Sequence, residues 1–211
     1  MRADWIQKIE KWKRWIEEIH SETSQLVFRR IIWDELVNII QSNRQIQISS
    51  AFYDWLPAVY APAQAMGIRR IADVDSYSKP VSLGNLLTDM RDCSEILQMY
   101  VEEIPLKIGT ASLTREMPNP SSDLQQLLHT IEPIKRYADK RIAHLDSNAA
   151  STIIRYGDIS GAIDLISSLT VEYYAFLCNS HYMVEPVFTY YWQQIFNVPW
   201  IPQSEDAEDE E

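Results

Sequence analysis

WIQKIEKWKRWIEEIH, residues 5–20, is the stretch that decides the fold of this chain. Its apolar side chains recur at steps of three and four residues, and most of its charged side chains lie off that stripe. The stripe comprises Trp5, Ile9, Trp12, Ile16 and Ile19. This spacing predicts an amphipathic α-helix that buries one face against partner helices.

Helical periodicity continues along the chain after this stretch. Residues 22–42 are denser in apolar side chains, which predicts a more central helix. A third helix is predicted over residues 49–66, bent or interrupted at Pro57 and Pro62 because proline removes a helical hydrogen bond. Gly67 follows directly and is predicted to end this helix.

Three further segments extend the pattern to the C-terminal half. A helix is predicted over residues 82–100, with the serine at its start as the N-cap. Residues 105–120 are expected to form an irregular connection. Ser122 has capping-box spacing and is predicted to start the next helix, which Pro133 kinks or restarts. Asp158 is predicted to cap a long apolar helix that follows.

These segments together predict an all-α fold. Five or six helices that can run antiparallel, joined mostly by modest loops, make a helical bundle. The chain has only five glycines and no Asn-Gly or Asp-Gly turn between alternating runs, which argues against an all-β fold. With 211 residues and 46% hydrophobic residues it can bury one sizeable core. We therefore expect a single domain over residues 1–202 and an acidic disordered tail over residues 203–211.

The formal net charge of −11 is concentrated at the C-terminus. Residues 205–211 carry six acidic side chains, which leaves a net charge of −5 on the rest of the chain. Non-specific nucleic-acid affinity depends on many neutralised phosphates, so any RNA contact of this body must be local. The tail is expected to be a solubilising extension, and the alternative is that it mimics nucleic acid or docks on a basic partner.

The sequence lacks the patterns of exported, membrane-spanning and metal-binding proteins. Its N-terminus is charged from the start, and no run approaches the roughly 18 apolar residues that span a bilayer. Cys93 and Cys178 lie far apart without a CxxC pattern or a His/Cys cluster, so neither zinc nor a disulfide framework is indicated. We expect a soluble cytoplasmic protein with no cofactor, no bound metal and no membrane partner.

The densest group of ionisable side chains is IKRYADKRIAHLD, residues 134–146. Histidine can exchange a proton near neutral pH, and arginine or lysine can hold a phosphoryl oxygen. At about 100° per residue of an α-helix, four side chains fall within roughly 80° of His144. They are Arg136, Tyr137, Lys140 and Arg141. The alternative is that these cations only complement the negative end of the helix dipole.

Part of this stretch, YADKRIAHLD at residues 137–146, resembles the signature segment of HEPN-fold proteins, in particular the branch associated with bacterial abortive infection. In that branch an Arg-Asp/Asn-Lys-x-x-Ala-His-x-Asp string lies on a helix of an α-bundle. GIRRIAD at residues 67–73, followed by residues 81–87, resembles the segment before the next helix of that branch. The general helix layout is similar over about residues 5–180.

The resemblance implies a metal-independent endoribonuclease that acts as a toxin or phage-defence effector. It usually works as a homodimer whose two motifs face each other across the interface. His144 would then act in acid–base catalysis on the ribose 2′-hydroxyl, and Asp139 would orient the site. An arginine would stabilise charge in the transition state. The RNA-binding residues that we expect are Arg136, Tyr137, Lys140, Arg141, Arg69 and Arg70. An antitoxin or another defence-system protein is a further expected partner.

Ala138 stands where that pattern has its catalytic arginine. Arg136 is one residue too distant from the histidine to replace it, and Arg141 is too near. Three explanations remain: position 138 has been changed deliberately to disarm a toxic enzyme, the chain is a natural degenerate member, or one of these neighbouring arginines has taken over the role. The near-intact remainder of the motif favours the first. The competing hypothesis is a non-catalytic helical dimer that binds RNA, a nucleotide or a protein.

Overall fold

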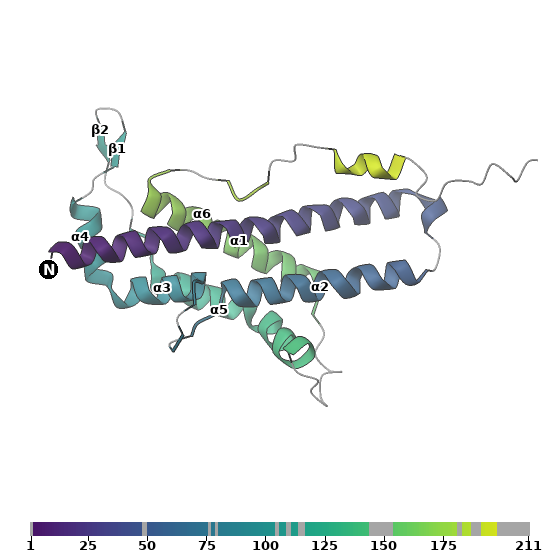
Figure 1. Cartoon of the computed structure of the whole chain (residues 1–211), viewed down its shortest axis with the longest axis horizontal. Coiled ribbons are helices and arrows are strands. Elements are labelled where there is room, and N and C mark those ends of the chain that lie inside the picture. Colours follow the sequence, from purple (N-terminus) through teal and green to yellow (C-terminus); the bar gives the residue numbers. More distant parts are fainter. Residues whose placement is uncertain are drawn as a thin grey trace, which may run out of the picture.

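The computed structural model describes residues 2–47, 50–75, 77–78, 80–103, 106–108, 111–113, 117–143, 154–180, 183–186 and 191–197. Six α-helices lie in this part of the chain, and they confirm the predicted all-α bundle (Figure 1). The predicted tail at residues 203–211 lies outside the described residues. The elements in chain order are α1 (Arg2–Ser42), η1 (Arg44–Ile46), α2 (Ala51–Ile71), α3 (Leu83–Asp92), α4 (Ser94–Glu103), β1 (Leu106–Ile108), β2 (Ala111–Leu113), α5 (Pro120–Tyr137), η2 (Ala138–Ala143), α6 (Tyr156–Cys178) and η4 (Trp192–Asn197).

The longest element is α1, which joins the first two predicted helices into one of 41 residues. Its predicted apolar stripe is buried, and Trp12 and Ile16 have no exposed surface. The buried face continues through Thr23, which is polar and hydrogen-bonds Thr170, to Leu26 and Val27, which are also in the core. In Figure 1, α2 runs antiparallel beside α1, and α6 packs against α1 as well. The core therefore lies along α1, where several helices meet.

The predicted end of the third helix was wrong, because α2 continues through both prolines and past Gly67 to Ile71. Gly67 is buried where α2 packs against α1, and a Cβ atom built on it would lie 2.6 Å from Cδ2 of Leu26. Glycine at this position therefore permits a close approach of two helices instead of ending one. Packing against a neighbour thus overrode a local helix-ending signal.

The predicted helix over residues 82–100 is divided into α3 and α4 at Cys93, whose backbone leaves the helical region with φ −117° and ψ 39°. Ser82 is confirmed as the N-cap, since its hydroxyl oxygen accepts a hydrogen bond from the backbone N–H of Asn85 at 3.1 Å. α3 packs against α1 and α5. Its first turn lies close under the end of α2, because a Cβ on Gly84 would be 2.6 Å from the carbonyl oxygen of Ala72.

The connection predicted to be irregular contains a short antiparallel pair, β1 and β2, in which Leu106 lies opposite Leu113. The pair projects from the helices in Figure 1. α5 then begins two residues before the predicted start, at Pro120. The Asn119 side chain accepts a hydrogen bond from the N–H of Ser122 at 3.2 Å and caps the helix. α5 continues through Pro133 to Tyr137, so the proline does not restart the helix.

α6 is the most apolar helix of the bundle and packs against both α1 and α5. Asp158 lies in its first turn, three residues inside the N-cap Arg155, and accepts a hydrogen bond from the Arg155 N–H at 3.0 Å. α6 therefore begins about one turn earlier than predicted, and Asp158 is its third residue instead of its N-cap. No helix among the described residues has both the length and the apolar character that a bilayer span requires.

Candidate functional site

The predicted motif begins at the end of α5 and continues into η2, which is a π-helical turn. Arg136 and Tyr137 are the last residues of α5, and Asp139 is in the first part of η2. A π-helix closes its hydrogen bonds between residues i and i+5, so its side chains are spaced differently from the α-helical spacing assumed in the sequence analysis. His144 lies outside the described residues. π-Helical turns are frequent at functional sites of proteins, which draws attention to this corner.

Ala138, at the expected arginine position, has no exposed surface and belongs to the hydrophobic core. It follows Ile134, which is also fully buried one turn earlier, and Ile142 packs against the same core one turn later. An arginine at position 138 would have to bring its guanidinium into a close-packed apolar interior. The side chain at this position therefore points into the core and away from solvent.

Asp139, the next residue, contacts an arginine from a different helix. Nε of Arg69 donates a hydrogen bond to Oδ1 of Asp139 at 2.6 Å, and the two side chains are 36% and 37% exposed. Arg69 lies in the last turn of α2, which packs against both α5 and η2. The structure thus brings together two of the residues predicted for the site, from segments 70 residues apart.

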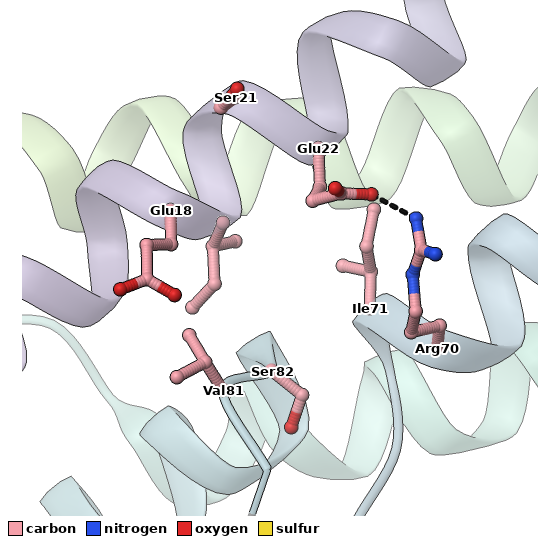
Figure 2. A pocket seen from close by; sticks show the side chains of 8 residues that line it. Glu18, Ser21, Glu22, Arg70, Ile71, Val81 and Ser82 are labelled. Carbon is pink, nitrogen blue, oxygen red and sulfur yellow. Dashed lines mark hydrogen bonds and ion pairs between the residues drawn. The ribbon is translucent and has the colours of Figure 1, made fainter.

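Arg70 lies beside Arg69 in sequence but serves another surface. It forms an ion pair with Glu22 of α1, as Figure 2 shows. Both residues line a hollow of about 360 Å³ between α1, the end of α2 and the start of α3, together with Glu18 and Ser82. Two carboxylates and one paired arginine make this hollow unsuited to phosphate. Of the predicted arginine pair, only Arg69 therefore contacts the part of the motif that the structure describes.

A comparison of the sequence with known protein families shows the family to which the chain belongs. Residues 9–194 match the HEPN_AbiU2 family, described as AbiU2. The chain belongs to this HEPN family. The match extends from α1 to η4 and includes both Arg69 and the motif, so the resemblance to the abortive-infection branch is confirmed. No curated protein and no solved structure matches the chain.

The other predicted residues of the HEPN motif differ in what they contact. Nη2 of Arg136 bonds Oε1 of Glu132 one turn back on α5 at 3.0 Å. The half-buried ring of Tyr137 packs against the hydrophobic core. Lys140 is half-buried and Arg141 is exposed on η2, and neither has an ion-pair partner within the described part of the chain. Of these four side chains, the last two are therefore the ones without an ion-pair partner among the described residues.

The HEPN bundle also has an aromatic surface that the sequence analysis did not single out. Trp33 stacks on Tyr60 with ring centroids 4.3 Å apart, and Tyr156 of α6 lies against the same indole at 5.4 Å. Burial raises the pKa of both tyrosines. An apolar hollow of about 380 Å³ lies beside this stack, and exposed Trp55 lines it. The sequence signal of this surface, aromatic residues on three helices, is the same as that of a buried core.

No three carboxylate, imidazole or thiol side chains of the described residues lie close enough together to hold a metal ion. The chemistry available at the α2–η2 corner is that of Arg69, Asp139, Lys140 and Arg141, which can bind and orient an anion. A proton-transfer group has to be added to this set for hydrolysis or transesterification. His144 is the next ionisable residue along the chain.

Proposed function

We propose that this HEPN chain is a metal-independent endoribonuclease that acts in the cytoplasm as a toxin or phage-defence effector. The observation that carries the proposal is the contact of Asp139 with Arg69, on the same turn as Lys140 and Arg141. Two elements contribute cations to one exposed corner immediately before His144 in the chain. Such a set can hold a phosphodiester while a histidine transfers protons.

The reaction that this set supports is attack within the RNA chain. His144 accepts the proton of the ribose 2′-hydroxyl, and the 2′-oxygen forms a bond to the adjacent phosphorus. The bond from phosphorus to the 5′-oxygen breaks, and that oxygen takes up a proton. The products are a 2′,3′-cyclic phosphate and a 5′-hydroxyl. Cations at the corner stabilise the extra negative charge of the phosphorane-like transition state.

The second candidate function is a non-catalytic RNA-binding module. The burial of Ala138 favours it, because the arginine of the family pattern is absent and its position is closed to solvent. The corner keeps its capacity to bind phosphate in this case, since Arg69, Lys140 and Arg141 remain. The burial also supports a natural alanine over a deliberate disarming substitution.

Cleavage of RNA without metal distinguishes the two functions. Total tRNA and mRNA are incubated with the chain in the presence of a chelator, and product ends are analysed for cyclic phosphate. We expect cleavage by the parent chain and its loss in His144→Ala, while His129→Ala, an exposed histidine of α5, cuts like the parent. RNA binding without cleavage would favour the binding module, and neither binding nor cleavage would exclude both.

We further propose that the chain works as a homodimer, as members of the resembled family usually do. Exposed apolar side chains on α2, among them Phe52, Trp55 and Val59, give the chain a surface that a second copy can cover. Sedimentation should show a species of twice the chain mass. A chain that stays monomeric at micromolar concentration would contradict a site composed of two motifs. An antitoxin or other defence protein is the second proposed partner, and co-purification from the native host tests it.

A further inference from the structure

Arg69 stands in the last turn of α2, where this helix meets η2. We propose that Arg69 is the phosphate-binding arginine of this site, in place of the one that is missing at position 138, and that Asp139 positions its guanidinium. The assignment rests on the proposed action on RNA and names the residue that contacts the phosphate. The family resemblance only places Arg69 among several expected RNA-binding residues, together with Arg70, and it is the contact with Asp139 that selects Arg69 for this role.

The burial of Ala138 excludes position 138 as the source of the phosphate-binding arginine. Position 138 is fully buried, whereas the side chain of Asp139 is 37% exposed, so the solvent-facing part of the η2 turn starts at Asp139. A cationic side chain at position 138 could reach this surface only if it left the core. α2 is the element that reaches the turn from outside α5, and it presents Arg69 there.

The geometry of the contact leaves most of the guanidinium available. A guanidinium carries five N–H donors in one plane, and Asp139 accepts from the Nε–H alone. The two terminal nitrogens have no hydrogen-bond partner among the described residues. Because one edge is held, the plane is oriented before a ligand arrives, and the free edge can donate two parallel hydrogen bonds to phosphoryl oxygens.

The other arginines near the motif lack this combination of orientation and availability. Arg70 and Arg136 are each paired with a glutamate, on α1 and α5 respectively. Arg141 is exposed on η2 but is held by no carboxylate in the described part of the chain. Arg69 is the one that is both oriented by an aspartate of the motif and partly open to solvent.

A purely structural ion pair between α2 and η2 is the competing interpretation, and the two make opposite predictions for Asp139→Ala. If Asp139 only adds a negative charge near the RNA, its removal should strengthen the attraction to phosphate. If Asp139 positions Arg69, its removal should weaken RNA binding even though the net charge becomes more favourable. The sign of the change in affinity therefore separates positioning from simple charge.

The test uses the full chain and a labelled single-stranded 2′-O-methyl RNA, which lacks the attacking hydroxyl and cannot be cut. Fluorescence anisotropy gives the affinity at several salt concentrations. For Arg69→Gln we expect an affinity about fivefold to tenfold lower, and a slope of log K against log salt that is smaller by about 0.7, the share of one phosphate contact on a single strand. Asp139→Ala should also bind more weakly than the parent.

Arg91→Gln is the matched control. Arg91 also lies in the last turn of a helix, its Nε also donates to an aspartate, Asp92, and its side chain is 43% exposed. This variant should keep the parent's affinity and salt slope. An unchanged affinity and slope in Arg69→Gln, or tighter binding by Asp139→Ala, would overturn the assignment. Thermal unfolding of each variant shows whether it has retained the fold.

The outcomes separate this assignment from the proposed nuclease activity. A parent that binds RNA without cutting it, and whose binding depends on Arg69, supports Arg69 and contradicts the nuclease. A parent that cuts, with Arg69→Gln equal to it in rate and affinity, supports the nuclease and overturns Arg69. If the parent binds no RNA, inorganic phosphate is the probe, read by the NMR signal of the Arg69 Nε–H. A shift that Asp139→Ala abolishes supports the site, and no shift overturns it.

Discussion

The indole N–H of Trp12 donates a hydrogen bond to Oδ2 of Asp89 at 3.0 Å and joins the buried face of α1 to α3. The same carboxylate accepts from Nζ of Lys8 at 2.8 Å and from Nζ of Lys11 at 3.3 Å. Burial alone would raise the pKa of Asp89, but the hydrogen bonds from Lys8 and Trp12 outweigh it, and the pKa lies below its usual value. One carboxylate of α3 therefore accepts hydrogen bonds from three side chains of α1 and ties the two helices together.

The lowered pKa of Asp89 makes its contribution to stability depend on pH. A carboxyl with a lower pKa in the folded state stabilises that state above its unfolded pKa of about 3.9, and the contribution is lost as the pH falls through the folded pKa. We expect Asp89→Asn to lower the free energy of unfolding by about 1–3 kcal/mol at neutral pH. The difference from the parent should shrink below pH of about 4. Urea unfolding of both chains at a series of pH values measures this difference in the free energy of unfolding.

Asp92→Asn is the control for this pH series. Among the described residues Asp92 pairs only with its neighbour Arg91, and its side chain is 58% exposed, so its replacement should change stability by less than about 1 kcal/mol at any pH. A loss in Asp89→Asn that stays the same at acidic and neutral pH would show that the pairing of the ionised carboxylate is not its source.

The hydroxyl of Tyr173 on α6 donates a hydrogen bond to Oδ2 of Asp123 on α5 at 2.6 Å, and the ring of Tyr173 is fully buried. Burial and the neighbouring carboxylate raise the pKa of Tyr173 far above its usual value, so the phenol remains a donor. Removing the hydroxyl leaves a charged acceptor without its partner. We expect Tyr173→Phe to lower the free energy of unfolding by about 1.5–3 kcal/mol. Tyr191→Phe, at a residue that is 80% exposed, should unfold like the parent in urea.

Two glycines should respond to alanine in opposite directions. A Cβ on Gly84 would lie 2.6 Å from the backbone oxygens of Ala72 and Asp73, so α3 would have to move away from the end of α2. Gly161 in α6 has no atom within 4 Å of the same position. We expect Gly84→Ala to cost about 1–3 kcal/mol and Gly161→Ala to stabilise by about 0.5–1 kcal/mol. Melting temperatures that move the same way would contradict this packing.

Restoring the family arginine tests the burial of position 138. In the packing described, Ala138→Arg forces a charge and a long side chain into the core, and we expect a loss of about 3 kcal/mol or more. Leu128→Arg, at an exposed position of the preceding helix α5, should cost less than about 0.5 kcal/mol. Calorimetry measures both. An Ala138→Arg chain that melts like the parent and cuts RNA, while the parent does not, would show instead that the alanine disarms the enzyme.

Local patterns in the sequence predicted the parts of the fold that depend on local physics. The stripe from Trp5 to Ile19 is buried as its period predicted, and Ser82 caps α3 because an N-cap needs only the neighbouring N–H groups. The end of α2 was mispredicted, since Gly67 was interpreted without knowledge of Leu26 against it. The break at Cys93 has no strong local signal, so it was missed as well.

The sequence by itself determined which chemical groups the motif holds, because Asp139, Lys140, Arg141 and His144 are close neighbours in the chain and need no folding to be near one another. Only the tertiary structure decided that Ala138 faces the core and that Asp139 meets Arg69. The reason is that a helix presents its side chains in all directions, and the neighbours it packs against determine which of them are buried. Here α2 closes on the end of α5 and brings an arginine to a turn that lacks its own at position 138.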